Sequence, residues 1–178
     1  MYVTTHNTTI ALNPLTGKQL WKSKAADYQE GQAMTAAPLI ANGVLMTGIA
    51  GGEYGTRGFI DGWDPATGKK LWRFYTTAAG NEKGADTWPG DTAMKGGAPT
   101  WLTGAYDPEL DLVYWGTGNG GPWNAEARKG DNLYIASVVA FRPKTGELVW
   151  HYQFTPNDPY DYDATEVGML VDMKIEGK

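Results

Sequence analysis

The sequence of 178 residues contains no cysteine and only two histidines. The lack of cysteine excludes a disulfide scaffold, a thiolate metal site and a cysteine nucleophile. Neither His6 nor His151 lies in a pattern typical of a catalytic base, so a serine nucleophile has no support. No apolar run approaches the roughly 18 residues of a membrane span. The formal net charge of −5 argues against a nucleic-acid partner.

An export signal is also missing from the first residues, which form a strand-like run with no basic or long apolar region. The chain is therefore expected either not to be exported or to lack the segment that would export it.

The sequence is instead rich in glycine and tryptophan, with 24 and 8 residues respectively. The phrase Pro-x-Thr-Gly, followed after three residues by Trp, occurs three times, within residues 11–21, 62–72 and 140–150. Because glycine accepts the positive φ of a tight turn, each copy predicts a β-hairpin whose second strand carries the tryptophan. Such repeats are typical of a β-propeller. We expect Trp21, Trp72 and Trp150 to pack between neighbouring blades.

The remaining segments also favour strands and loops. Hairpins are predicted over residues 37–47 and 104–116, and a strand over 133–141. No segment has a sustained helical period, so the chain is predicted to be all-β. Residues 77–96 are interpreted as an insertion loop and residues 155–164 as a second loop, and loops on a propeller face often carry function.

Four oxygen-bearing side chains in segments outside the repeat are candidate metal ligands: Glu53, Asn119, Asp161 and Asp163. Carboxylate and amide oxygens suit Ca²⁺ or another hard cation rather than zinc. The alternative is that all four are ordinary turn residues, since Asn and Asp favour turns. The Gly-x-Gly of residues 116–118 is not followed by a helix start, which argues against a nucleotide site.

Three motifs carry a resemblance to a known family. They are Gly-Gly-Glu-Tyr-Gly-x-Arg-Gly at 51–58, Gly-Thr-Gly-Asn with Pro-Trp-Asn within 116–124, and Thr-Pro-Asn-Asp-x-Tyr-Asp-Tyr-Asp at 155–163. Together they resemble the quinoprotein alcohol dehydrogenases, which use pyrroloquinoline quinone (PQQ) and include methanol and ethanol dehydrogenases. The resemblance covers essentially the whole chain. It implies an eight-bladed propeller, of which residues 1–178 would be a single incomplete domain of about three four-stranded blades.

The resemblance also implies roles for individual residues. Glu53, Asn119 and Asp161 would bind the metal ion, and Asp161 would also be the catalytic base. The residues implied to contact PQQ are Thr35, Gly51, Gly52, Glu53, Thr100 and Trp101, with the Trp101 indole as the stacking platform. Asp163 stands where the lanthanide-dependent branch of the family carries an extra metal-binding carboxylate. We therefore expect a lanthanide ion in preference to Ca²⁺.

The implied activity is PQQ-dependent oxidation of a primary alcohol to an aldehyde, with the metal ion as Lewis acid. Electrons would pass to a cytochrome c in the periplasm. The family's Cys-Cys disulfide and further PQQ contacts belong to blades that are missing here, so the chain alone is expected to be inactive and to bind PQQ weakly. The alternative is a non-catalytic propeller with the same repeats that acts as a periplasmic assembly scaffold.

Overall fold

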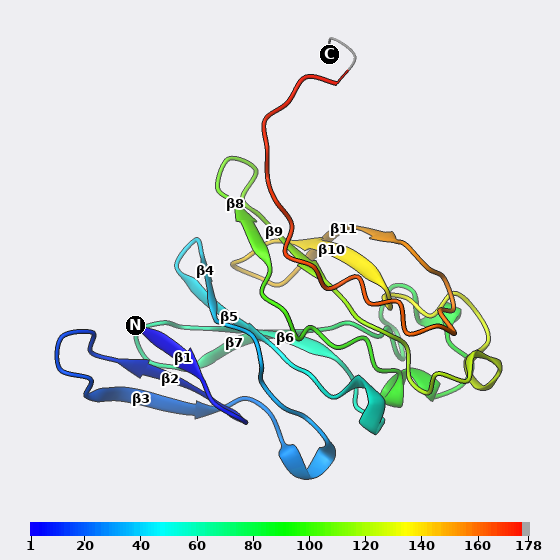
Figure 1. The fold of residues 1–178 in the computed structure, drawn as a ribbon, viewed down its shortest axis with the longest axis horizontal. Helices are drawn as coiled ribbons and strands as arrows, with labels where there is room; N and C mark the ends of the chain where they lie inside the picture. The colour runs from blue at the N-terminus through cyan, green and yellow to red at the C-terminus, as the bar shows by residue number, and fades with distance from the viewer. Residues whose placement is uncertain (176–178) are drawn as a thin grey trace.

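The computed structural model describes residues 1–175, which form three antiparallel sheets lying side by side (Figure 1). The first sheet contains β1 (Tyr2–Thr4), β2 (Thr8–Leu12) and β3 (Gln19–Lys24). The second contains β4 (Leu39–Ala41), β5 (Val44–Gly48), β6 (Phe59–Trp63) and β7 (Lys70–Tyr75). The third contains β8 (Ala105–Asp107), β9 (Leu112–Gly116), β10 (Ser137–Phe141) and β11 (Leu148–Gln153).

In every sheet the strands follow one another in chain order, which is the arrangement of propeller blades. The helices of the described residues are short 3₁₀ turns: η1 (Tyr28–Glu30), η2 (Gly52–Tyr54), η3 (Ala85–Thr87), η4 (Thr92–Lys95) and η5 (Ala125–Arg128). None of these helices has the length and apolar character needed to cross a bilayer. The prediction of an all-β partial propeller is therefore confirmed.

Each repeated phrase forms a hairpin, as predicted. The pairs are β2–β3, β6–β7 and β10–β11, and all three have a register shift at the same place, one strand residue before the turn. In the first turn the Asn13 side chain accepts hydrogen bonds from the amides of Leu15 and Thr16. Asp64 does the same in the second turn with Ala66 and Thr67. The Asn or Asp before the proline therefore closes the turn locally.

Tryptophans of the repeat link one sheet to the next. Trp21 Nε1 on β3 donates a 2.9 Å hydrogen bond to the carbonyl oxygen of Pro65, in the β6–β7 turn. Trp72 Nε1 on β7 repeats this bond at 3.0 Å with Pro143, in the β10–β11 turn. The predicted packing between neighbouring blades is confirmed for these two residues. Trp150 contacts no such turn within residues 1–175 and is 42% exposed.

The core lies between neighbouring sheets. One cluster joins the second and third sheets and includes Met46, Ile60, Val113, Trp115 and Phe141, while a second cluster under the first sheet includes Ala26, Met34, Leu45, Phe59 and Trp63. Because each sheet needs the face of the next to bury its apolar side, the sheets form one continuous body.

Two expectations about strands need correction. The predicted strand over 133–141 begins only at Ser137, because Asn132 and Ala136 have positive φ and the amide of Tyr134 bonds to Thr76 instead of continuing the ladder. The first sheet has three strands among the described residues, whereas the other two have the four that were expected.

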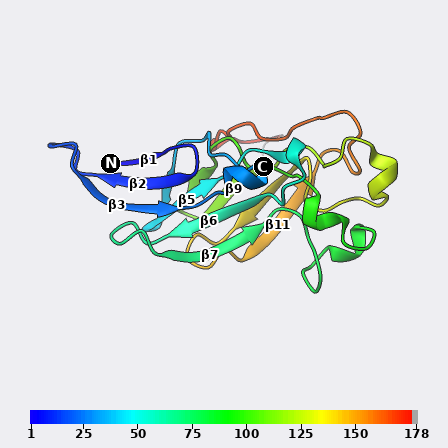
Figure 2. The same ribbon diagram turned by 90° about the horizontal axis from the view of Figure 1, so that it is seen from below.

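The long connections after β7 and β9 gather at one end of the sheets (Figures 1 and 2). The predicted insertion at residues 77–96 lies there and contains η3 and η4. It is packed rather than open, since Trp88 and Ala93 join a small buried cluster with Ile135. From Glu166 to Ile175 the chain runs away from the sheets and its residues are exposed.

Candidate functional site

The predicted site residues come from four separate connections. Glu53 lies in η2 after β5, Trp101 precedes β8, Asn119 follows β9, and Asp161 lies after β11. Side-by-side sheets bring these connections together, so residues more than 100 positions apart in the chain become neighbours. A propeller therefore assembles its site from equivalent loops of successive blades.

Glycines allow the first loop to approach the others closely. Gly51 has φ +114°, and a Cβ there would lie 2.0 Å from the carbonyl oxygen of Gly31. A Cβ on Gly52 would lie 2.7 Å from the Pro99 ring and 3.2 Å from the side-chain oxygen of Asn119. Any larger residue would push η2, and with it Glu53, away from the Asn119 loop.

Asp163 connects two other loops. Its Oδ1 accepts a 2.8 Å hydrogen bond from the Asn119 amide, and its Oδ2 accepts a 3.0 Å bond from Trp101 Nε1. The carbonyl of Trp101 in turn accepts a 2.8 Å bond from the Thr35 hydroxyl. The half-buried Trp101 ring is thus fixed from both sides and keeps part of its surface open.

The side-chain oxygen of Asn119 is buried and has no hydrogen-bond partner, although the amide nitrogen of the same side chain donates to Gly120 at 3.2 Å. An unpaired buried oxygen costs about 1–3 kcal/mol. It is consistent with a site whose ligand completes the coordination, because a metal ion would satisfy that oxygen.

Three carboxylates of the site, those of Glu53, Asp161 and Asp163, influence one another through their charges. Burial raises the pKa of Asp161, and the charges of Asp163 and Glu53 raise it further, against a hydrogen bond from Trp123. Burial also raises the pKa of Asp163, opposed by its bonds to Asn119 and Trp101. Mutual repulsion of this kind is relieved by a cation. Even so, within residues 1–175 the Asp, Glu and His side chains form no preassembled cluster of three around one point.

Thr100 requires a correction among the predicted PQQ contacts. Its side chain is fully buried. The hydroxyl donates to the carbonyl of Phe59 at 2.7 Å and accepts from the amide of Ile49 at 2.9 Å. Thr100 therefore holds β5 and β6 together, and its side chain presents no surface to a cofactor.

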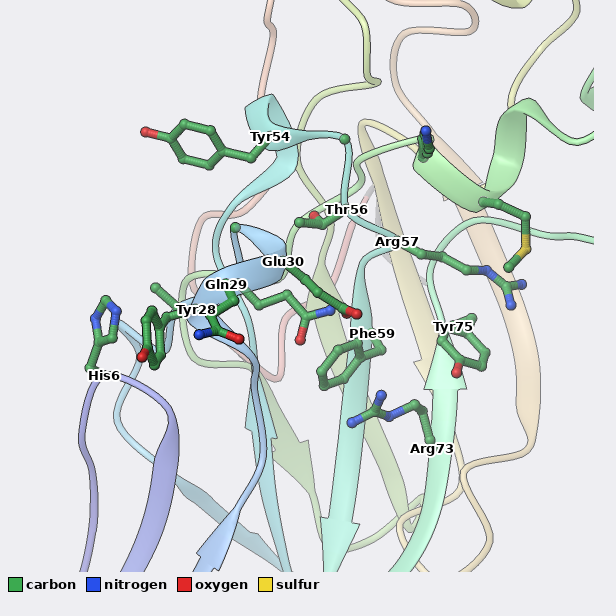
Figure 3. A pocket seen from close by; sticks show the side chains of 16 residues that line it. His6, Tyr28, Gln29, Glu30, Tyr54, Thr56, Arg57, Phe59, Arg73 and Tyr75 are labelled. Atoms are coloured by element: carbon green, nitrogen blue, oxygen red, sulfur yellow. The ribbon is translucent and has the colours of Figure 1, made fainter.

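A cavity adjoins the loop that carries Glu53, since Tyr54 and Gly55 line it. It measures about 1000 Å³, opens between the first two sheets and is lined by residues such as His6, Tyr28, Arg57, Phe59, Arg73 and Tyr75 (Figure 3). Both arginines are already paired, Arg57 with Glu82 and Arg73 with the buried Asp61. Their guanidinium groups also lie over the Tyr75 and Phe59 rings, at 3.8 and 3.3 Å from the ring centres. These two arginines therefore offer little unpaired charge to a ligand.

Sequence reasoning missed two buried residues beside the site, Arg128 and Asp158. Asp158 falls inside the acidic motif at 155–163, in which only Asp161 and Asp163 were predicted to be site residues. Arg128 is the last residue of the short helix η5, in a segment without any recognisable sequence pattern, so its burial could only be learned from the structure.

Residues 22–178 match the family described as "Glucose/ethanol/alcohol dehydrogenase, beta-propeller domain", a PQQ family. The chain belongs to this family. It is 45% identical to the quinohemoprotein alcohol dehydrogenase ADH IIB of Pseudomonas putida, over 95% of this chain and 26% of that protein. It is 41% identical to the lanthanide-dependent methanol dehydrogenase of Methylacidiphilum fumariolicum strain SolV, over 95% of this chain and 31% of that protein.

Solved structures give the same result for this PQQ-family chain. A europium-containing methanol dehydrogenase superposes with a TM-score of 0.95 at 39% identity, over 99% of this chain and 34% of that one. The chain thus spans about a quarter to a third of the length of these relatives. The relatives named here are dehydrogenases rather than assembly scaffolds, which favours the enzyme hypothesis over its alternative.

Proposed function

We propose that this chain forms the metal-binding and base-carrying part of a PQQ-dependent enzyme that oxidises a primary alcohol to an aldehyde. Membership of the PQQ family supports the reaction class. The unpaired, buried oxygen of Asn119, in a loop whose backbone is bonded to Asp163, is the observation that carries the proposal for this particular site. Cofactor chemistry of this kind leaves the protein to supply binding, orientation and electrostatics.

The proposed metal ligands are the side-chain oxygens of Glu53, Asn119, Asp161 and Asp163. All are hard oxygen donors, and three carry negative charge, which suits a trivalent lanthanide better than Ca²⁺. The relationship to a lanthanide-dependent methanol dehydrogenase supports this preference. The Gly51–Gly52 turn contributes by letting Glu53 lie close to Asn119.

The proposed platform for PQQ is the half-buried Trp101 ring, because a flat aromatic cofactor stacks well on an indole held in one orientation. Thr35 and Asp163 fix that orientation through the Trp101 carbonyl and indole nitrogen. Thr35, Gly51, Gly52 and Glu53 remain proposed contacts. When both are bound, PQQ supplies a two-electron acceptor and the metal ion supplies Lewis-acid activation.

Asp161 is proposed as the general base. Its carboxylate is exposed, so an alcohol hydroxyl can reach it. Accepting the hydroxyl proton at a carboxylate oxygen makes the alcohol carbon a better hydride donor. The proposed partners are a small primary alcohol and a periplasmic cytochrome c, together with the further blades that complete the propeller.

The experiment is Asp161→Asn in the complete propeller protein that carries this chain, loaded with PQQ and either La³⁺ or Ca²⁺. We expect kcat for alcohol oxidation to fall by about 10²–10⁴-fold while PQQ stays bound, because a positioned base contributes that much. Asp107→Asn, at the end of β8, is the matched control and should leave kcat unchanged. Wild-type protein that oxidises no alcohol when fully loaded would overturn the proposal and favour the scaffold.

The chain of 178 residues alone should bind PQQ weakly. Tight binding, seen as a saturating change in PQQ absorbance on titration, would contradict the idea that further blades supply essential contacts.

A further inference from the structure

Arg128, at the end of η5, is buried with no exposed surface, yet forms no ion pair among the residues that the structure describes. Burial lowers the pKa of its guanidinium, and the nearby charge of Asp158 acts in the opposite direction. A buried cation is costly unless its donors are well bonded. The groups that accept hydrogen bonds from the Arg128 guanidinium must therefore be identified.

All the bonds from the Arg128 guanidinium go to loops around the candidate site. Nε donates to the Pro122 carbonyl at 2.7 Å, Nη1 to Asn132 Oδ1 at 2.8 Å, and Nη2 to the Asp158 carbonyl at 2.5 Å. The guanidinium also lies directly under Gly120, where an added Cβ would be 2.6 Å from its central carbon. Arg128 thus joins the loop that carries Asn119 to the loop that carries Asp161.

Asp158 extends this connection toward the proposed base. It is 1% exposed, and its two carboxylate oxygens accept hydrogen bonds from the amides of Tyr160 and Tyr162, at 2.9 and 2.7 Å. Asp161 lies between these two amides and has φ +64°, a conformation that non-glycine residues adopt only when surrounding contacts hold it. The bonds on either side supply that constraint.

We propose that Arg128 and Asp158 are positioning residues that hold Asp161 in the orientation needed to complete the metal site. This inference rests on the proposed function, since it concerns the same ion. Arg128 fixes the backbone of Asp158, and the Asp158 carboxylate fixes the turn on both sides of Asp161. Neither side chain is a proposed ligand of the ion.

The first experiment needs no metal ion. Amide hydrogen exchange at Tyr160 and Tyr162 is compared in the wild-type chain, Asp158→Ala and Arg128→Met. Both variants should exchange these amides faster, while Asp107→Ala, which removes a similar carboxylate-to-amide turn between β8 and β9, should not. Unchanged exchange in Asp158→Ala would overturn the proposal.

The second experiment uses Tb³⁺ luminescence excited through tryptophan. Asp158→Ala and Arg128→Met should bind Tb³⁺ about 10–100-fold more weakly than the wild type, the usual effect of losing support for a metal ligand. Emission lifetimes in H₂O and D₂O should show about one additional bound water, because Asp161 no longer occupies its position. In an Asp161→Ala background, Asp158→Ala should cause no further loss.

The matched control for Arg128 is Arg142→Met, since Arg142 Nη1 also bonds two main-chain carbonyls, those of Leu110 and Asp111, far from the site. Wild-type affinity for Tb³⁺ in a folded Asp158→Ala variant would overturn the proposal. If that variant does not fold, Asp158→Asn provides the same comparison with one acceptor kept. A wild-type chain that binds no Tb³⁺ but protects the two amides would overturn the metal proposal and leave the Asp158 turn supported.

Discussion

The indole nitrogen of Trp101 donates its hydrogen bond to the carboxylate of Asp163 over 3.0 Å. This contact connects the surface proposed for PQQ with a side chain proposed for the metal ion. A change in the charge or position of Asp163 should therefore alter the environment of the Trp101 ring. The fluorescence of Trp101 offers a direct way to observe that change.

Asp163→Ala should reduce the preference for a trivalent ion. Removing one of three carboxylates weakens Tb³⁺ more than Ca²⁺, because the lost attraction scales with the charge of the ion. We expect the ratio of Tb³⁺ to Ca²⁺ affinity to fall by about tenfold, measured by luminescence titration with Ca²⁺ competition. Asp107→Ala is the control. An unchanged ratio would show that Asp163 serves only to tie Trp101 to Asn119.

The repeat tryptophans should differ in their contribution to stability. Trp72→Ala removes a ring packed against the next turn and should lower the free energy of unfolding by about 3 kcal/mol. Trp150→Ala removes a ring that is 42% exposed and should cost about 1 kcal/mol. Urea denaturation followed by circular dichroism measures both. Equal losses of unfolding free energy in the two variants would mean that the contact of Trp72 with the next turn contributes nothing to stability.

The turn glycines give an independent test of the same contact. Gly17 and Gly146 have nearly equal φ values of +69° and +70°, so alanine brings a similar backbone strain of about 1 kcal/mol at either position. A Cβ on Gly146 would lie 2.6 Å from the Trp72 ring, whereas nothing lies within 4 Å at Gly17. Gly146→Ala should therefore lower stability by about 1–3 kcal/mol more than Gly17→Ala. Thermal unfolding of the two variants decides this.

His151 should make the fold less stable in mild acid. Burial lowers its pKa below the usual 6.5, and the charge of Lys83 lowers it further. The unfolded chain then binds the proton more readily than the folded chain, so stability rises with pH through the range just below 6.5 and is lost as pH falls. Urea unfolding at pH 7.5 and 5.5 should show a smaller loss in His151→Gln than in the wild type. His6→Gln, at an exposed position, is the control.

Much of the fold could be predicted because its signals are local. Each Pro-x-Thr-Gly phrase sets a turn through its own glycine, and in the first two copies Asn13 or Asp64 adds local hydrogen bonds, so three hairpins and their tryptophans could be located from sequence alone. The strand expected from Leu133 failed for a reason that is not local. Its main chain bonds to the distant residue Thr76, and no pattern within residues 133–136 signals that choice.

The candidate site also contains residues that could be predicted from local motifs and residues that could not. Motif resemblance identified the chemically suitable residues, including Asn119 and Trp101, which the structure places beside Asp163. It also included Thr100, whose hydroxyl is used by the main chain of β5 and β6. Arg128 could not be predicted, because its importance arises from which loops it meets in three dimensions.

The links formed by Trp21 and Trp72 have a direction, since in both cases an indole of one sheet donates to a turn of the sheet that follows. Both links use the same donor and the same kind of acceptor. This donor–acceptor chemistry therefore fixes the order in which successive sheets are linked, but not how many there are. The number of units in a closed ring must come from the angle between successive sheets, a property of their packed faces.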